Sequence, residues 1–230
     1  MQSARTGTFP NECETMINQL ISLFWSGEQT YMNMSAASAS DEISMLGFSE
    51  YFRLCCLRMR TIADKLCQFQ TTRGGHLILG EVRSMIQMSN WNECTVDKLI
   101  HLALDMEKQF EQRLNELCVL AKQKNDSVTA EFVESTLLRD QVHVLKITVN
   151  HVNGLKVCEN AWIYDTLTMK PFVRQICEML GSGLTGVGQT CIPEMCVSTT
   201  SATGVGRNPC SSGSETCSEY LQSFVNSLRY

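Results

Sequence analysis

The feature that most constrains the fold is the absence of proline from residues 11–170, since all four prolines of the chain lie outside that stretch. Proline breaks the interior of a helix, so this stretch is free to form long helices. Within it, apolar residues recur at alternating steps of four and three, as at Phe48, Phe52, Cys55, Met59, Ile62, Leu66 and Phe69. This spacing is typical of a helix packed lengthwise against a partner. The sequence therefore predicts a bundle of long helices.

Four long helices are expected, and their approximate ranges are 12–38, 48–72, 95–124 and 127–152. A shorter helix over about 161–180 is expected to be interrupted or kinked near Pro171. The glycines of "RGG" at 73–75 suit a left-handed cap on the second helix, and Asn153-Gly154 is expected to end the fourth. About twenty residues join the second and third helices, enough to run the length of a bundle. This predicts two antiparallel hairpins joined by one crossover.

Residues 181–230 differ in composition from the rest of the chain. They contain seven of the 14 glycines and only five charged residues. We expect a flexible Gly/Ser/Thr-rich extension here, following a helical domain over 1–180. Thr216 and Glu219 have the spacing of a capping box. A short amphipathic helix follows, with its apolar face at Leu221, Phe224, Val225 and Leu228.

Composition limits the classes of function. A net charge of −5 disfavours a general nucleic-acid surface, and no apolar run is long enough to span a bilayer. The first residues lack the apolar core of a signal peptide, so we expect a cytoplasmic protein whose 12 cysteines stay mostly reduced. None of the cysteines has zinc-finger spacing. They are either small buried hydrophobes or, where exposed, redox-sensitive links between subunits.

Over about residues 9–180 the sequence resembles the ferritin family. The similarity lies in five blocks, "NQLISLFWSGEQTYMNMS", "TTRGGHL", "LDMEKQFEQRLNEL", "LAKQKNDSVTAEFVES" and "DQVHVLKITVNHVNGL". The last four keep the order and separation of the family's helix-end and helix-core residues. The resemblance implies an all-α fold, a ferritin-like four-helix bundle with a short fifth helix and a flexible C-terminal extension. It also implies a hollow homo-oligomer of 24 subunits.

The resemblance also locates the family's iron-oxidation centre, which needs inward-facing carboxylates and a histidine. The family's ligands are replaced at Phe24, Arg58, Met59 and Ile62. Three family residues remain, namely Tyr31, Glu107 and Gln141. One carboxylate and an amide cannot hold two irons, and an arginine repels cations. We therefore expect no catalytic residue, no cofactor and no metal site, with weak iron binding left open.

Three acidic residues keep two interpretations each. Glu107 lies on the apolar seam of its helix, where an unpaired charge is costly. It is either satisfied by neighbours, namely Arg58, Tyr31 or Gln141, or it is a weak metal ligand. Glu131 and Glu134 match the acids that line the family's threefold channels. They either pass cations or are solvated or interface acids.

A cysteine-rich chain with a long extension and replaced iron ligands resembles a branch of the family that is stored in dormant embryos. This implies a non-catalytic cage with a protective, storage or chaperone-like role, whose cavity is filled by C-terminal tails. Its partners are unfolded proteins and, as an open question, RNA; no membrane is involved. One alternative is an iron-storage subunit of mixed cages, with ferroxidase activity supplied by a partner chain. The other is an RNA-binding cage, which requires clustered basic residues such as Lys122, Lys124 and Lys146.

Overall fold

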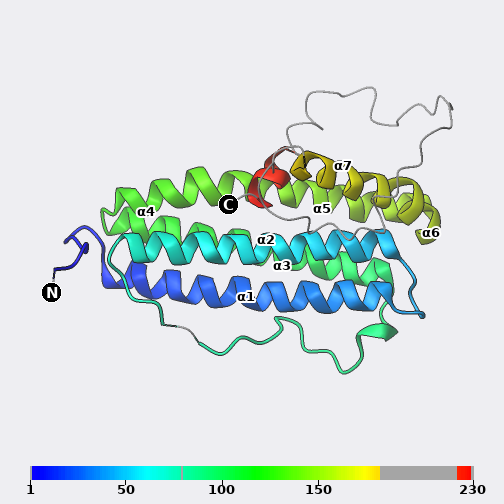
Figure 1. The fold of residues 1–230 in the computed structure, drawn as a ribbon, viewed down its shortest axis with the longest axis horizontal. Helices are drawn as coiled ribbons and strands as arrows, with labels where there is room; N and C mark the ends of the chain where they lie inside the picture. Colours follow the sequence, from blue (N-terminus) through cyan, green and yellow to red (C-terminus); the bar gives the residue numbers. More distant parts are fainter. Residues whose placement is uncertain (1, 79, 182–221, 229–230) are drawn as a thin grey trace.

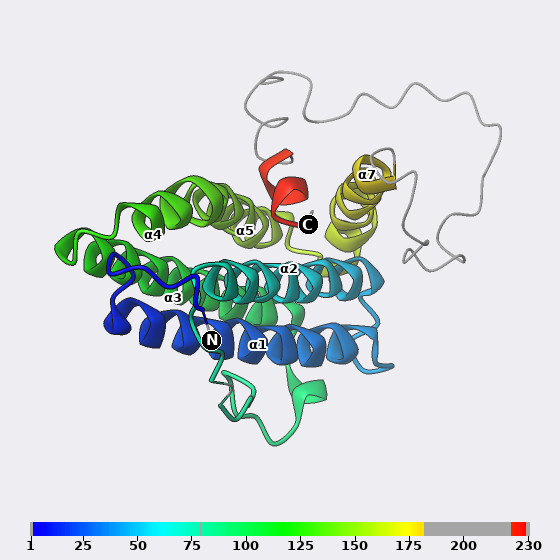
Figure 2. The ribbon, with the colours of Figure 1, turned by 60° about the vertical axis from the view of Figure 1, so that its left-hand side comes forward.

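Four long helices form the body of the protein. A computed structural model describes residues 2–78, 80–181 and 222–228. The first three helices are α1 (Asn11–Ala39), α2 (Leu46–Thr72) and α3 (Val96–Gln123). The fourth consists of α4 (Ser127–Phe132), a π-helical turn (Val133–Leu138) and α5 (Arg139–Cys158). Figure 1 and Figure 2 show these helices lying side by side, which confirms the all-α four-helix bundle.

The apolar seams expected from the sequence form the core. The buried residues of α1 and α3 include rows with the same steps of three and four. They are Ile17, Leu20, Phe24, Gly27, Tyr31 and Met34 on α1, and Val96, Ile100, Ala103, Glu107, Phe110, Leu114, Leu117 and Ala121 on α3. On α2 the seam is buried from Phe48 to Leu66, and Phe69 at its end packs partly buried against the core. The alternation of three and four steps thus identified the inward face of each helix.

The crossover between α2 and α3 runs along α1, as both ribbon views show. It contains one short 3-10 turn (Trp91–Glu93). Two polar residues of α1 hold it: the Asn18 side chain bonds to His76 and Ile78, and the Thr30 hydroxyl accepts from the Met85 amide at 2.7 Å. At its start Gly74 has φ +73°, which confirms the left-handed cap expected at "RGG".

The prediction that Asn153-Gly154 ends the fourth helix is wrong. The helix continues to Cys158 and ends where Glu159 adopts φ +56°. Gly154 serves close packing instead, because a Cβ at this position would lie 2.7 Å from the hydroxyl oxygen of Tyr164. Glycine signals both caps and close approaches, and only the tertiary contact distinguishes them.

The fifth helical segment is irregular before Pro171, which confirms the expected interruption. It comprises α6 (Ala161–Tyr164), a π-helical turn (Asp165–Met169) and α7 (Lys170–Gly181). The buried Asp165 carboxylate accepts hydrogen bonds from the amides of Gly47 at 3.1 Å and Phe48 at 2.8 Å. These are first-turn amides of α2, for which the preceding residue Met45 supplies no side-chain cap. Asp165 therefore caps a helix far away in the sequence.

Residues 222–228 form a last short helix. Phe224 and Val225 are fully buried and Leu228 is partly buried, as expected for an apolar face. The proposed capping box at Thr216 and Glu219, and Leu221, lie outside the described residues, as does most of the extension. Among the helices of the described ranges, none has the length and apolar character needed to cross a membrane.

Five of the cysteines in the described ranges are buried, and they are Cys13, Cys55, Cys56, Cys94 and Cys118. Burial raises the pKa of the Cys55 and Cys56 thiols well above the ordinary value. A thiol with a raised pKa is a poor nucleophile at neutral pH. For these five positions the structure agrees with the interpretation as small core residues. Cys191, Cys196, Cys210 and Cys217 lie outside the described residues.

We expect Asp165→Ala to destabilise the protein by about 2 kcal/mol, because it leaves two buried amides of α2 without an acceptor. The measurement is the shift in thermal unfolding by calorimetry at fixed protein concentration. Asp105→Ala is the control, because Asp105 is exposed and its ion pair with the exposed Lys108 is long, at 3.9 Å. This variant should change the stability by less than about 0.5 kcal/mol. Equal losses for both variants would show that α2 does not depend on this cap.

His151 on α5 makes stability depend on pH. It is buried, its Nδ1 lies 3.0 Å from the Tyr164 hydroxyl, and its ring packs on Phe172. Burial lowers the pKa of His151 from 6.5 to about 4. Between pH 6.5 and about pH 4, His151 binds a proton in the unfolded chain but not in the folded chain. The contribution of the neutral His151 to the free energy of unfolding is therefore fully present above pH 6.5 and is lost as the pH falls toward 4. The total contribution is about 3 kcal/mol.

We expect His151→Phe to remove this part of the pH dependence, as measured by urea unfolding midpoints between pH 7.5 and 4.5. Val157→Phe introduces the same ring at an exposed position on α5 without removing a titratable group, and it should leave the pH dependence unchanged. Parallel pH curves for wild type and His151→Phe would contradict the assignment.

Candidate metal centre at the middle of the bundle

One polar side chain from each long helix reaches the centre of the core. They are Tyr31 of α1, Arg58 of α2, Glu107 of α3 and Gln141 of α5. Each is at most 1% exposed. These are the three remaining family residues and one replaced position that the sequence singled out, so the structure brings them together.

The four side chains form one hydrogen-bonded network around Glu107. Arg58 Nη2 lies 2.5 Å from both carboxylate oxygens, an ion pair in the core. The Tyr31 hydroxyl donates to Oε1 at 2.5 Å, and Gln141 Nε2 donates to Oε2 at 2.7 Å. Arg58 Nη1 also donates to Gln141 Oε1 at 3.0 Å. The expectation that neighbours satisfy Glu107 is confirmed.

The network uses the full acceptor capacity of the carboxylate. An ionised carboxylate has about four lone-pair positions. Each oxygen of Glu107 accepts from Arg58 and from one further donor, Tyr31 on one side and Gln141 on the other. A metal ion would have to displace one of these donors. Among the described side chains of the network, Arg58 Nε is the one buried polar atom without a hydrogen-bond partner.

Arg58 and Tyr31 keep their protonation states at neutral pH. Burial alone would lower the pKa of Arg58, but the adjacent Glu107 carboxylate raises it above the ordinary value for arginine. Burial, and then the charge of Glu107, raise the pKa of Tyr31 well above 10. Arg58 therefore remains a cation and Tyr31 remains a neutral hydrogen-bond donor.

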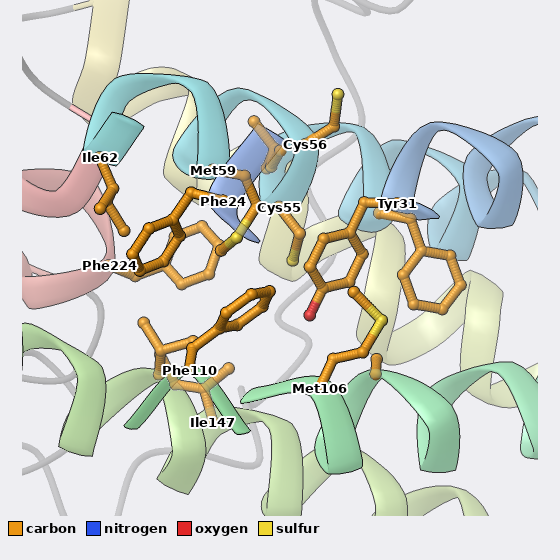
Figure 3. Close-up of a cluster of buried hydrophobic side chains, with 14 of the residues drawn as sticks. Phe24, Tyr31, Cys55, Cys56, Met59, Ile62, Met106, Phe110, Ile147 and Phe224 are labelled. Carbon is orange, nitrogen blue, oxygen red and sulfur yellow. The ribbon is translucent and has the colours of Figure 1, made fainter. Parts of the chain in front are cut away.

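Apolar side chains fill the remaining space around this network. Phe24, Met59 and Ile62 are at most 5% exposed, and Figure 3 shows them in one cluster with Phe110. The rings of Phe24 and Phe110 stack with centroids 5.1 Å apart. Gly27 permits this packing, because a Cβ there would lie 2.6 Å from the Phe110 ring. Phe24, Met59 and Ile62, which stand where the family has iron ligands, therefore lie within packed hydrophobic core.

The donor set does not fit a pair of irons. Such a pair needs several carboxylates and a histidine facing inward, whereas this site offers one carboxylate already bound to an arginine. Elsewhere in the described ranges, no three His, Cys, Asp or Glu side chains are grouped so that they could hold a metal ion.

Glu131 and Glu134 lie apart from this network, on an open surface depression beside Lys122. Glu134 forms an ion pair with Lys122 and accepts from the Cys118 thiol at 3.4 Å. The sequence did not predict this pairing, since Lys122 and Glu134 lie on different helices and no local spacing relates them. The lysine offsets one of the two negative charges that were expected to attract cations.

We expect Arg58→Met or Glu107→Leu alone to cost about 3–5 kcal/mol, because each leaves an uncompensated group in the core. The double variant should recover most of the loss, since it replaces the pair with apolar side chains of similar size. Calorimetry at fixed protein concentration measures all three. Arg60→Met is the control, because Arg60 pairs with Glu28 while 63% exposed; it should cost less than about 1 kcal/mol. Additive losses in the double variant would contradict the coupling.

Comparison of the sequence with known proteins shows which family this four-helix bundle belongs to. The family model described as "Ferritin-like domain" matches residues 14–157. The chain is 28% identical to "Ferritin, middle subunit" of Salmo salar over 155 residues, covering 67% of this chain and 86% of that protein. It is 29% identical to "Ferritin heavy chain" of Echinococcus granulosus over 165 residues, covering 70% and 94%.

The chain is also similar to a plant relative, "Ferritin, chloroplastic" of Phaseolus vulgaris, with 26% identity over 161 residues. That match covers 68% of this chain and 63% of the plant protein. The family model spans more than half of the chain and coincides with the four long helices. The chain therefore belongs to the ferritin-like domain family.

Proposed function

We propose that this chain is a non-catalytic subunit of a ferritin-like cage with a protective, storage or chaperone-like role in stress or dormancy. In this it resembles artemin, the ferritin homologue of encysted brine shrimp embryos. The observation that carries the proposal is the Arg58–Glu107 ion pair at the centre of the bundle. A cation of the protein occupies the place where the family's chemistry would bind cations.

Two features support the loss of ferroxidase activity. The single carboxylate has no free acceptor position, and the surrounding positions Phe24, Met59 and Ile62 are apolar and buried. Substrate iron entering this region would find the negative charge of Glu107 already compensated by Arg58. Under this proposal any residual iron binding is weak and lies outside the network.

The composition of residues 181–230 supports a filled cavity. This extension is weakly charged and ends in a helix whose apolar residues Phe224 and Val225 are buried in the described structure. We propose a homo-oligomer of 24 subunits in the cytoplasm, with the extensions inside. Mineral storage would need the volume that the extensions then occupy.

Unfolded proteins are favoured over RNA as partners. Of the lysines given above as examples of such a basic cluster, Lys122 is paired with Glu134 and Lys124 with Glu12. Each pair offsets the positive charge that phosphates would need. RNA binding is therefore the weaker form of the protective proposal.

The second candidate function is an iron-storage subunit of mixed cages, with oxidation supplied by an intact partner chain. The similarity to "Ferritin light chain 1" of Mus musculus, 28% over 156 residues, favours it. That match covers 68% of this chain and 84% of the mouse protein. The two candidates differ in whether the assembled protein retains iron.

The test is aerobic oxidation of Fe(II) by the purified oligomer, followed by a count of the iron retained per subunit. We expect oxidation at the buffer rate and no retained iron, because Glu107, the one carboxylate of the central network, is already bonded to Arg58, Tyr31 and Gln141. An active ferritin heavy chain, treated in parallel, provides the positive control. Oxidation well above the buffer rate would contradict the proposal.

Co-assembly with that heavy chain separates the two candidates. Iron retained by mixed cages in proportion to their volume would favour the storage subunit. We expect reduced retention together with suppression of heat-induced aggregation of a client protein such as citrate synthase. No suppression by the homo-oligomer would contradict the protective role.

A further inference from the structure

Two sulfur atoms meet in the crossover between α2 and α3. The Cys94 thiol donates to the Met88 thioether, and the distance from Sγ to Sδ is 3.8 Å. Cys94 is 4% exposed, and Met88 is partly buried against the core. Neither residue belongs to the central network or stands where the family has iron ligands. The pair therefore has no part in the site described above.

The neighbouring structure holds each sulfur atom in place. The 3-10 turn Trp91–Glu93 ends where the Cys94 amide donates to the Trp91 carbonyl at 3.1 Å. The next residue, Thr95, is the N-cap of α3 and accepts a backbone N–H with its side chain. Cys94 is thus fixed between a turn and the start of a helix, while Met88 packs on the core. Ligands that are held in place before binding lose little conformational entropy when they bind.

The separation of the two sulfur atoms fits a shared metal ion. Two metal–sulfur bonds of about 2.3 Å, the length in zinc–thiolate sites, span 3.8 Å when the angle between them is about 110°. This angle is close to those of trigonal and tetrahedral coordination. Both sulfur atoms can therefore bind one ion at the distance that already separates them.

The chemistry of the pair favours one class of ion. A thiolate and a thioether are soft ligands, and soft ligands select Cu(I) over harder cations. A zinc site would need further ligands. In the described ranges no three His, Cys, Asp or Glu side chains are grouped to supply them. When Cu(I) binds, Cys94 releases its proton to water and the thiolate forms the bond, with no change in oxidation state.

Solvent reaches the pair from the side of the bundle opposite the last helix. In Figure 1 and Figure 2 the crossover lies along α1, whereas the last helix lies beyond α2. The residues on either side of Met88, namely Gln87 and Ser89, are exposed, as is Thr95 next to Cys94. An ion can therefore enter without opening the core and without passing the extensions that we place inside the cage.

We propose that Met88 and Cys94 form a binding site for Cu(I) in the crossover. Met88 supplies the thioether and Cys94 the thiolate. Because two soft ligands act together, this site fills before the single thiols of the chain. The inference goes beyond the proposed function and is independent of it, since the site requires neither a cage nor a client.

The test follows the methyl group of Met88, because the chain has 12 cysteines and a count of bound ions alone would not locate the site. The full-length oligomer is labelled with 13C at the methionine methyl groups. The Met88 signal is identified by its loss in Met88→Leu, a substitution that conserves volume. The probe is Ag(I), which shares the preference of Cu(I) for sulfur and is stable in air. It is added up to one equivalent per subunit, and Cu(I) is then used in the same way without oxygen.

We expect the Met88 signal to shift in wild type within the first equivalent of either ion. The shift should be absent in Cys94→Ser, because the thioether alone binds weakly. It should be unchanged in Cys158→Ser, which removes a partly exposed thiol at the end of α5. The signal of Met32, an exposed thioether on α1, should not move in any of these proteins.

A Met88 signal that stays in place in wild type would overturn the inference, and this result does not depend on the folding of any variant. An equal shift in wild type and Cys94→Ser would also overturn it, because the two sulfur atoms would then not share an ion. Neither result bears on ferroxidase activity or on the protection of clients, so the proposed function would still stand.

Discussion

The buried pair of Arg58 and Glu107 is the interaction on which the arrangement of the bundle depends. Two charges removed from water are unfavourable unless their geometry is good and every remaining acceptor is used. Here Tyr31 and Gln141 complete the set, so that each of the four long helices contributes one member. A helix shifted by one turn, about 5.4 Å, would leave a charge or an acceptor unsatisfied. The network therefore selects one relative register of all four helices, which the surrounding apolar side chains alone would specify less strictly.

In our proposal, the same pair of Arg58 and Glu107 also explains why the bundle has no iron site. A ferritin-type centre requires several negative groups in the core, which the protein must tolerate when no metal is bound. In this chain Arg58 stands at one of those positions and supplies the compensating positive charge. The other positions are hydrophobic, namely Phe24, Met59 and Ile62. The core gains internal neutrality without a bound ion. The centre of such a bundle can hold either metal ligands or packed side chains. The residues of α2 at this point, Arg58, Met59 and Ile62, are buried and packed.

The helices and the inward faces were predictable from the sequence because they depend on local periodicity. The steps of three and four identified the seams, and the lack of proline identified the long helices. The residues of the central network were found through the family resemblance, and the pairing of Glu107 followed from the cost of a lone buried charge. Two features were missed because they arise from contacts distant in sequence. Gly154 was taken for a cap when it faces Tyr164, and nothing near Lys122 indicated its pairing with Glu134.

The cap that Asp165 gives to α2 has a consequence for the order in which the chain becomes stable during synthesis. Gly47 and Asp165 are 118 residues apart. At about 5–20 residues per second, roughly 6–24 s separate their appearance at the ribosome. During that interval the hairpin of α1 and α2 emerges with the first turn of α2 still uncapped and its inner face uncovered. The first two helices thus depend on later residues of their own chain for a complete helix cap and a covered inner face.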